Sequence, residues 1–472
     1  MVNIGVLKLR GSMPYYEELP FNVIVDKPNI IKDLDALIMP PGTLVESRVL
    51  ERYGWLGKEV WDFVERGGYV IGVCSGAQLL SRSINLNVRG VPGYVNGIGI
   101  LDISFEPLIV TGPVRVKVIN ESWATKGLLN KELIGWQAHT YGKMVIQDHN
   151  NVQVDGISII SRYNYRDAMI EAPTLVSSRK YRVFGTMVHG ILGPESPIAR
   201  NMFRELDVHD ESIKDYYRKG QERTWLLRKD SNSKGNPRII TVVSTMTGEG
   251  KTLITSAIAH CLNESGYYVG VAKLGGDIRD LHPSLYILKR PFKPWMSIKL
   301  KWNSKSLGWT SWPDTIKEVT SLGIDFLIVE GVMGLLTGSS RDRGDDPSST
   351  LGFIRHVNTD VVLIASASYD GVEGALFRLR HYVNKLIELD RKPIIVILNN
   401  AYHGVHEDEE LRKFNAELNA LSIYFVTISN LELSSKPEEL IDLGDYEEAS
   451  VIISRNICNS FTSILKAMNY LR

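Results

Sequence analysis

The stretch VVSTMTGEGKTLITSAIAH, residues 242–260, decides the fold of the second half of the chain. A valine-rich apolar run leads into a glycine-containing turn, and a helical pattern begins at Lys251 and Thr252. In this order the backbone N–H groups of the turn converge on phosphate oxygens, the lysine adds positive charge and the threonine hydroxyl can bind Mg²⁺. The stretch predicts a phosphate-binding loop rather than a chance glycine-rich helix start.

Residues 245 and 246 of this loop indicate which class of nucleotide-binding protein the sequence resembles less. The strict P-loop pattern needs glycine at position 245, where this chain has Thr245. Met246 occupies the position of an extra lysine in partitioning ATPases of related fold, and a thioether cannot contact phosphate as a cation does. A partitioning role therefore loses support. We expect ATP to be bound by the residues that form the loop and begin the helix: Thr247, Gly248, Glu249, Gly250, Lys251 and Thr252.

Strand-like apolar runs recur outward from this loop in both halves of the chain. They are NIGVLKL, FNVIV, ALIMP, YVIGVC, VRVKVI and YRVFGTMVHG, then RIITVVST, YYVGVAKL, DFLIVEG, DVVLIAS, PIIVILNN and IYFVTI. Continuous runs rich in valine and isoleucine, alternating with helical patterns, predict parallel sheets covered on both faces. A chain of 472 residues also exceeds what one core usually supports. The fold class is α/β in two tandem domains, joined at the polar stretch RKDSNSKGNP, residues 228–237.

The bulk composition gives no argument for a nucleic-acid or membrane partner. Lysine plus arginine and aspartate plus glutamate both number 54, so the formal net charge is zero. No window approaches the roughly 18 apolar residues that cross a bilayer. The three cysteines, Cys74, Cys261 and Cys458, are widely spaced and suggest neither a disulfide framework nor a metal site. We therefore expect a cytoplasmic protein.

A second chemical site is predicted where YVIGVCSGAQLL, residues 69–80, places Cys74 between a buried strand and a helix. With Gly72 and Gly76 on either side, the pattern is the cysteine form of a nucleophile elbow, a tight turn that lifts the side chain clear of the sheet. A cysteine nucleophile needs a base, and His189 in FGTMVHGIL is a candidate. A buried structural cysteine is the alternative for the elbow alone.

Four segments resemble the class I glutamine amidotransferase domain of cobyric acid synthase and its relatives. They are IMPPGTLVESRVLERYG (38–54), GVCSGAQLL (72–80), IGWQAHTYG (134–142) and GTMVHGIL (185–192). The resemblance covers about residues 1–207 and implies a flavodoxin-like domain. Many class I domains carry a glutamate two residues after the histidine, where this chain has Ile191. The cobyric acid synthase branch also lacks that glutamate.

This resemblance implies roles for five residues. Cys74 would attack the carboxamide of glutamine, and His189 would be its base. The backbone near Gly42 and Ser75 would form the oxyanion hole, and Gln78 would hold the substrate glutamine. Ser75 itself stands where the family has glycine.

The second half resembles cobyrinic acid a,c-diamide synthase within the dethiobiotin synthetase superfamily. The segments that carry the resemblance are the loop itself, AKLGGDIRDLHP (272–283) and DFLIVEGVMGLLTG (325–338). The resemblance implies that Asp277 and Glu330 bind Mg²⁺ with Thr252, and that Lys273 faces a phosphate or a substrate carboxylate. The implied domains are a glutaminase at 1–207, a linker at 208–237 and a P-loop amide synthase at 238–472.

Together the two sites predict a glutamine-hydrolysing carbon–nitrogen ligase of cobalamin biosynthesis. ATP would convert a carboxylate of a polycarboxylate corrinoid into an acyl phosphate, and ammonia from glutamine would attack it. A homodimer is left open. The domain order is the reverse of that in known cobyrinate enzymes. The alternatives are a dethiobiotin-synthetase-like carboxylase, or a nucleotide-switch ATPase with a regulatory glutamine-binding domain.

The segment 289–312 combines lysines and tryptophans, and no aspartate or glutamate lies between Leu281 and Pro313. Cations beside indoles suit a flat polycarboxylate macrocycle. They also suit single-stranded nucleic acid, and a lid with partly buried tryptophans explains them equally well.

Overall fold

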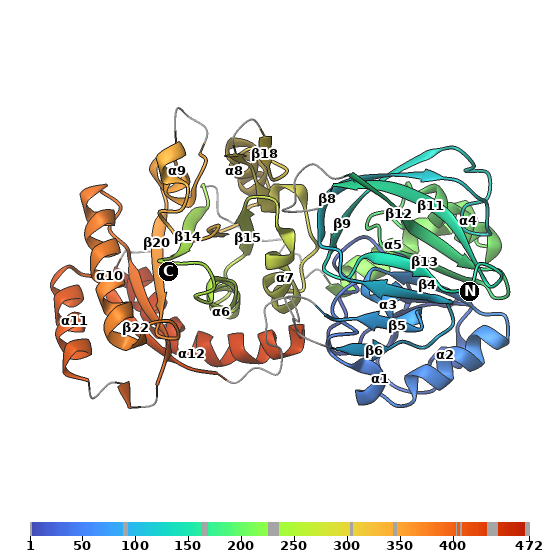
Figure 1. Ribbon diagram of the computed structural model, residues 1–472, viewed down its shortest axis with the longest axis horizontal. Coiled ribbons are helices and arrows are strands. Elements are labelled where there is room, and N and C mark those ends of the chain that lie inside the picture. The colour runs from blue at the N-terminus through green and yellow to red at the C-terminus, as the bar shows by residue number, and fades with distance from the viewer. Residues whose placement is uncertain are drawn as a thin grey trace. The chain divides into compact units, whose positions relative to one another are not determined.

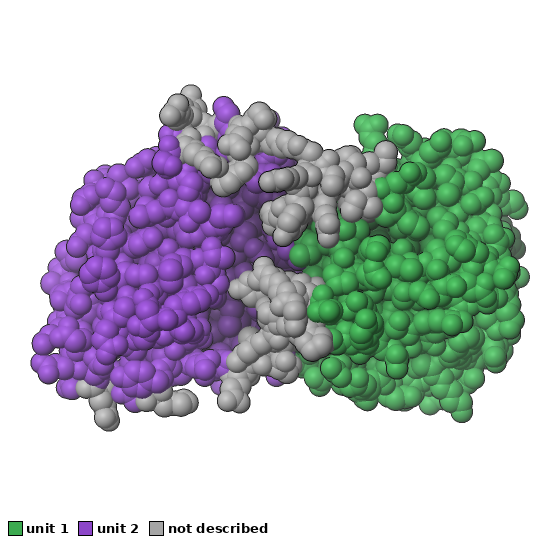
Figure 2. Space-filling view, in the orientation of Figure 1, with its two compact units in different colours: residues 1–227, 289–292, 434–444 green, residues 228–288, 293–433, 445–472 purple. Residues whose placement is uncertain are grey.

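The computed structural model describes residues 2–87, 93–161, 169–224, 236–302, 305–342, 347–402, 404–405, 408–431 and 442–467. The chain forms two compact units, coloured separately in Figure 2. Unit 1 comprises residues 1–227, 289–292 and 434–444, and unit 2 comprises residues 228–288, 293–433 and 445–472. Most of the expected linker at 228–237 lies outside the described residues, and the domain boundaries at 207 and 238 stay a prediction.

The main sheet of unit 1 begins with five parallel strands that carry the thiol site (Figure 1). Their order is β2 (Val23–Val25), β1 (Ile4–Leu7), β3 (Ala36–Met39), β4 (Tyr69–Val73) and β13 (Val183–Thr186). Numbered along the chain this is the order 2-1-3-4-5 of flavodoxin-like folds. Strands β1, β3, β4 and β13 are buried on both faces, as expected for parallel strands inside a sheet, whereas β2 at the edge is only partly buried.

Four antiparallel strands extend this sheet, and here the expectation of parallel pairing is wrong. They are β12 (Met169–Ser178), β11 (Val152–Ser161), β8 (Val110–Val118) and β9 (Glu132–His139). The run VRVKVI lies mostly in β8, where Arg115 and Lys117 are exposed and the flanking valines are buried. Such alternation is typical of an antiparallel sheet with one solvated face.

A small sheet and five helices complete unit 1. The sheet has the order β10 (Lys143–Ile146), β7 (Ile103–Glu106), β5 (Ser83–Asn85), β6 (Tyr94–Asn96). The helices are α1 (Val49–Arg52), α2 (Leu56–Glu65), α3 (Ser75–Leu80), α4 (Pro197–Glu205) and α5 (Asp210–Thr224), with the 3-10 turn η1 (Ile31–Asp33). Helix α5 lies within the stretch that the sequence assigns to a linker. One continuous core joins the strands to their helices.

Unit 2 is built on seven parallel strands, which confirms the prediction for this half. Their order is β16 (Ser297–Ile298), β15 (Val269–Leu274), β19 (Phe326–Glu330), β14 (Arg238–Ser244), β20 (Asp360–Ser366), β21 (Ile395–Ala401) and β22 (Tyr424–Ser429). Helices α9 (Thr350–His356), α10 (Gly371–Glu388) and α11 (Glu409–Ala420) pack against one face through Leu363 and Val396. The neighbouring Val362 and Ile364 are also buried.

The remaining elements of unit 2 include helix α6, which contacts β14, β15 and β19. They are α6 (Lys251–Glu264), η2 (Ile278–Leu281), α7 (His282–Leu288), η3 (Pro294–Met296), β17 (Leu300–Trp302), β18 (Lys305–Leu307), α8 (Trp312–Ser321), η4 (Ser339–Arg341) and α12 (Leu443–Ala467). Among the described residues, no helix is both long enough and apolar enough to cross a membrane.

Two of the cysteines form a disulfide, which corrects the expectation that none would pair. Cys261 on α6 and Cys458 on α12 are bonded although 197 positions separate them in the chain. The sequence could not reveal the pair, because the two helices meet only in the folded unit. Cys74 is left as a free, buried thiol.

Candidate active site

The turn around Cys74 has the strained geometry that the elbow pattern predicts. Cys74 lies between β4 and α3 with φ 51° and ψ −109°, a backbone conformation that a side chain rarely adopts. A Cβ at position 72 would lie 2.7 Å from the amide nitrogen of Ala77, and one at position 76 would lie 2.1 Å from the carbonyl oxygen of Met39. Both glycines are therefore required for the helix to pack this closely beneath the thiol.

The imidazole of His189 is held by a carboxylate that the sequence analysis missed. His189 follows β13, and its Nδ1 lies 2.8 Å from Oε1 of Glu17. Oε2 of the same carboxylate accepts a hydrogen bond of 2.6 Å from the backbone N–H of Gly190. Both side chains are 1% exposed. Glu17 lies in YYEELP near the N-terminus, 172 positions away, and no motif marks it.

The thiol and the imidazole are electrostatically coupled. Burial disfavours a charged imidazolium, but Cys74 and Glu17 outweigh burial and raise the pKa of His189 to about 10. Because Glu17 holds Nδ1, Nε2 is the nitrogen available to the thiol. Among the described residues, no atom lies in hydrogen-bonding geometry with Nε2. The arrangement orients a base toward a cysteine, as nucleophilic catalysis requires.

Two aromatic side chains pack on this imidazole, and a third packs on those two. The Trp136 ring stacks on His189 with centroids 5.8 Å apart, and the Tyr16 ring meets it edge-on at 5.3 Å. Backbone hydrogen bonds also join Trp136 and His189 in both directions. The Phe292 ring lies 5.9 Å from Trp136 and 6.1 Å from Tyr16. Burial, reinforced by Cys74 and Glu17, raises the pKa of Tyr16 well above its usual value.

The loop that carries Gly42 lies against the first turn of α3. Gly42 has φ 137°, and a Cβ there would lie 2.0 Å from the carbonyl oxygen of Gly11. The backbone N–H of Leu44 donates to Oγ of Ser75 at 2.8 Å. The structure thus brings the predicted oxyanion segments together. Gln78 is 3% exposed and donates to the carbonyl oxygen of Tyr141 at 2.7 Å.

A buried aspartate from the far end of the chain fastens this same loop region. Oδ1 of Asp442 accepts from the hydroxyl of Ser47 at 2.8 Å, and Oδ2 accepts from Nε of Arg10 at 3.2 Å. The backbone N–H of Leu443 donates to the hydroxyl of Thr43 at 3.2 Å. Residues 442–444 are therefore part of unit 1, although α12 continues from them into unit 2.

The phosphate loop of unit 2 has its predicted form between β14 and α6. Gly248 and Gly250 have φ of 82° and 90°, and a Cβ at position 250 would lie 2.4 Å from Nδ2 of Asn399. Thr247 and Gly248 are exposed at the turn. Nζ of Lys251 donates to Oγ of Ser244 at 2.9 Å. Burial, together with Lys273, lowers the pKa of Lys251 to about 8.

The side chain of Glu249 points into the protein, so its carboxylate shapes the loop rather than meeting phosphate. It is fully buried and accepts from the hydroxyl of Thr245 at 2.8 and 2.9 Å and from the N–H of Met246 at 2.8 Å. It also accepts from the N–H of Ser366 and from Arg378, both at 3.1 Å. Of the predicted ATP contacts at position 249, only a backbone contact fits this arrangement.

Three other predicted residues meet at the carboxyl end of β19. Oε1 of Glu330 accepts from the hydroxyl of Thr252 at 2.9 Å and from Nζ of Lys273 at 2.8 Å. Lys273 also contacts Asp280 at 2.6 Å. Burial raises the pKa of Glu330 although Lys273 opposes it. Oε2 of Glu330 is buried and accepts no hydrogen bond from the described residues, so an oxygen ligand is available for a hard cation.

Asp277, which Lys273 influences electrostatically, forms an ion pair with Arg279. Its carboxylate binds Nε and Nη2 of Arg279 at 2.9 and 2.6 Å. Burial opposes the charge, but Arg279 and Lys273 lower the pKa of Asp277. Its place as a metal ligand stays a prediction.

The described tryptophan side chains of the segment 289–312 differ in burial. Trp295 is 6% exposed and packs beside Gly270 in the core, whereas Trp309 and Trp312 are half-buried. Strands β17 and β18 pair antiparallel, and the exposed Lys299 and Lys301 lie just before β17 and within it. The hydroxyl of Ser297 donates to the carbonyl oxygen of Gly275, which ties the segment to the turn after β15.

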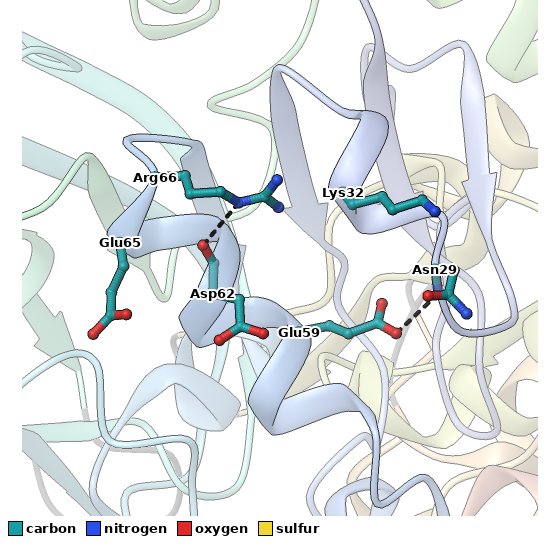
Figure 3. Close-up of a pocket in the computed structure, with 6 residues that line it drawn as sticks. All are labelled: Asn29, Lys32, Glu59, Asp62, Glu65 and Arg66. Atoms are coloured by element: carbon teal, nitrogen blue, oxygen red, sulfur yellow. Dashed lines mark hydrogen bonds between the residues drawn. The ribbon is translucent and has the colours of Figure 1, made fainter.

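A surface hollow of about 530 Å³ lies elsewhere on unit 1 (Figure 3). Its lining is Asn29, Lys32, Glu59, Asp62, Glu65 and Arg66. In Figure 3 the acidic side chains project from α2, and Glu59 accepts from the N–H of Asn29. None of the predicted site residues lines it, and it is bounded by the solvated face of the amphipathic helix α2 and by Asn29 and Lys32.

Comparison with known proteins defines the class of unit 1. Residues 15–197 match the family model of the CobB/CobQ-like glutamine amidotransferase domain. Unit 1 is therefore similar to the glutamine amidotransferase domain of the CobB/CobQ proteins, and the match covers less than half of the chain. A cobyric acid synthase of Caldanaerobacter subterraneus subsp. tengcongensis is 27% identical over 183 residues, or 35% of this chain and 33% of the relative. One of Brucella abortus is 32% identical over 133 residues, or 27% of this chain and 26% of the relative. The matched region spans about a third or less of these relatives.

Among solved structures, a MinD cell division protein of Aquifex aeolicus has a TM-score of 0.32 at 15% identity, covering 48% of this chain and 97% of its own. A glutamine amido transferase of Methylobacillus flagellatus has a TM-score of 0.27 at 17% identity, covering 47% of this chain and 93% of its own. At TM-scores this low the likeness supports no argument.

Proposed function

We propose that this protein is a glutamine-dependent ligase that uses ATP to amidate carboxylates of a corrinoid precursor in cobalamin biosynthesis. The observation that carries the proposal is the buried Cys74, His189 and Glu17 constellation in a CobB/CobQ-like domain. A carboxylase or a nucleotide switch would have no use for an oriented thiol and imidazole.

In unit 1, His189 takes the thiol proton at Nε2, and the Cys74 sulfur attacks the carboxamide carbon of glutamine. Backbone N–H groups near Gly42 and Ser75 stabilise the oxyanion. The imidazolium returns the proton to the leaving nitrogen, which departs as ammonia. Water then hydrolyses the thioester to glutamate and frees the thiol. Glu17 keeps the imidazole in the required tautomer throughout.

In unit 2, the substrate carboxylate attacks the γ-phosphorus of ATP, and ADP leaves. The backbone of the loop at Gly248 and Gly250 binds the phosphates, and Lys251 offsets their charge. Thr252 and Glu330 would hold Mg²⁺, which neutralises phosphate charge when bound. Ammonia attacks the acyl phosphate at its carbonyl carbon, and inorganic phosphate departs with formation of the amide. Lys273 is suited to bind an anionic group here once Asp280 releases it.

Cys74→Ala tests the proposal in assays with cobyrinate and MgATP. The variant should lose glutamine-dependent amidation and keep ammonia-dependent amidation, because only the source of ammonia is removed. Lys251→Ala is the matched control and should lose both. Equal loss of the two activities in Cys74→Ala, or no amide formed by the wild-type protein from either nitrogen source, would contradict it.

A further inference from the structure

A carboxylate from the last part of the sequence is buried against residues 41–47, here called the oxyanion loop. Residues 434–444 belong to unit 1, and the side chain of Asp442 within them is 2% exposed. Its Oδ1 accepts from the hydroxyl of Ser47 at 2.8 Å, and its Oδ2 accepts from Nε of Arg10 at 3.2 Å. A buried carboxylate is costly unless it is paired and hydrogen-bonded, so these two partners fix its position.

The two partners of this carboxylate come from two chain segments that meet at Gly42. Arg10 directly precedes Gly11, and the carbonyl oxygen of Gly11 accepts from the N–H of Thr43 at 2.7 Å. A Cβ at position 11 would lie 2.3 Å from Oγ of Ser47, and a Cβ at position 42 would lie 2.0 Å from the carbonyl oxygen of Gly11. No side chain fits between the segments, so a displacement of either one moves Gly42.

A closed ring of hydrogen bonds ties the oxyanion loop to the carboxylate. The hydroxyl of Thr43 accepts from the N–H of Leu443 at 3.2 Å and lies 3.3 Å from the hydroxyl of Ser47. Because Ser47 gives its proton to Asp442, Thr43 is the donor between the two hydroxyls. The ring closes because Leu443 directly follows Asp442. Hydrogen bonds that share donors and acceptors in this way support one another, so the loss of Asp442 loosens the whole ring.

The oxyanion loop reaches the thiol through its middle residues. The N–H of Leu44 donates at 2.8 Å to Oγ of Ser75, the residue that follows Cys74. Among the described residues, no backbone carbonyl accepts a hydrogen bond from the N–H of Gly42, which leaves this group for an oxyanion. Such a donor is effective only within about 3 Å of the oxygen on which charge develops. The position of Gly42 therefore decides how well the transition state is stabilised.

We infer that Asp442 is a positioning residue of the thiol site, because it holds the oxyanion loop where Gly42 can stabilise the oxyanion of glutamine hydrolysis. The inference rests on the proposed glutaminase. Asp442 acts through Ser47 and Thr43 rather than on the substrate. An oxyanion exists only along the reaction path, so the loss of Asp442 should lower kcat and leave the KM for glutamine almost unchanged.

A purely structural role for Asp442 is also available, because this residue immediately precedes α12. Its Oδ1 accepts from the N–H of Gly444 at 2.9 Å, the arrangement of a helix N-cap. Serine and asparagine cap helices as well as aspartate does. The shorter serine cannot also reach the hydroxyl of Ser47, whereas asparagine can. Both substitutions keep the cap, so comparing them separates the two roles even if Asp442→Ala does not fold.

The test measures kcat and KM for glutamate release by the full-length protein with glutamine, MgATP and cobyrinate. Asp442→Ala and Asp442→Ser should lower kcat by about 10- to 100-fold, because a displaced oxyanion donor loses part of the roughly 10²- to 10³-fold that its removal costs. The KM should stay within about twofold of the wild-type value. Asp442→Asn keeps an acceptor for Ser47 and should recover most of kcat.

A second readout distinguishes a positioning role from a general loss of structure. Alkylation of Cys74 by iodoacetamide depends on His189 and Glu17, and it should proceed at the wild-type rate in all three Asp442 variants. A disordered thiol site would change the rate of alkylation together with kcat.

Two further variants complete the test. Asp408→Ala is the matched control and should keep the wild-type kcat, because Asp408 caps α11 in unit 2 by accepting from the N–H of Leu411 at 3.1 Å. Ser47→Ala combined with Asp442→Ala should be no slower than the slower single variant, since both break one link. An unchanged kcat in Asp442→Ala, or equal kcat values in Asp442→Ser and Asp442→Asn, would overturn the inference. A wild-type protein that releases no glutamate would instead reject the proposed glutaminase itself.

Discussion

The two chemical sites of this protein are assembled in opposite ways. The phosphate loop is local, since its shape follows from Gly248, Gly250 and the inward Glu249 within one turn. The thiol site is built from distant stretches, because Glu17 binds a histidine at position 189 and Phe292 packs on Trp136, which stacks on that histidine. A local site such as the phosphate loop can be predicted from a short sequence motif. A site such as the thiol site also depends on distant residues that no local motif identifies.

The largest effect is expected from removing the long-range partner in the thiol site. Glu17→Gln should lower the rate of glutamine hydrolysis by about 10³- to 10⁴-fold, because the imidazole loses its enforced tautomer and its stabilising charge. The pKa of His189 should fall from about 10 toward 6.5. Its raised pKa stabilises the fold fully below about pH 6.5, and that stability is lost as the pH rises to about 10. Because Cys74 also raises this pKa and remains in the variant, the pH dependence of stability in this window should become smaller, measured by urea unfolding.

Glu18→Gln is the matched control for this experiment, because Glu18 is the exposed neighbour of Glu17. Near-normal glutamine hydrolysis in Glu17→Gln would mean that His189 is oriented without the carboxylate, and the contrast between the two sites would disappear.

The phosphate site should show the opposite dependence on pH. The pKa of Lys251 is lowered to about 8 from 10.5, so this group makes the fold more stable as the pH rises between those values. Phosphate favours the charged ammonium, so nucleotide binding at pH 9 should take up a proton. Affinity should weaken by about tenfold per pH unit above 8. Calorimetry in buffers of different ionisation enthalpy measures this uptake.

Lys251→Gln is the control for proton uptake, because it removes the titrating group and keeps a polar side chain. Uptake that persists in this variant would assign the proton to another residue.

The smallest effect is expected at the junction of the two loops beside the thiol. Ser75→Ala removes the acceptor for the N–H of Leu44, which should cost about 1 kcal/mol of stability. If that N–H then points less well toward the oxyanion loop, hydrolysis should slow by up to about tenfold. Ser81→Ala, at the other end of α3, loses a bond to the carbonyl oxygen of Gln78 and should leave the rate unchanged. Equal rates of glutamine hydrolysis in the two variants would mean that Ser75 does not position the oxyanion segment.

The sequence predicts most strands of unit 2 and the parallel strands of unit 1, because buried parallel strands have continuous runs of apolar residues. The prediction of parallel strands is wrong at VRVKVI, where the alternation of valine with Arg115 and Lys117 indicates a half-exposed antiparallel strand. The elbow glycines could be predicted because their constraint is local. Glu17, Phe292 and the Cys261–Cys458 bond could not, since each depends on which distant elements meet after folding.

Unit 1 contains residues from three separate parts of the sequence, so the gene cannot be cut between the two units without removing part of unit 1. A protein truncated after residue 227 would lack both Phe292 and Asp442. Arg10 and Ser47 would lose the Asp442 carboxylate that accepts their hydrogen bonds. The rings of Tyr16 and Trp136 would lose their contact with Phe292 and become exposed to solvent. If the rest of the chain were supplied as a separate polypeptide, its residues 289–292 and 434–444 would both have to bind to unit 1 again. Expression of the halves apart should therefore yield a weakened glutaminase, and a fused, uninterrupted reading frame is the form in which this architecture can be maintained.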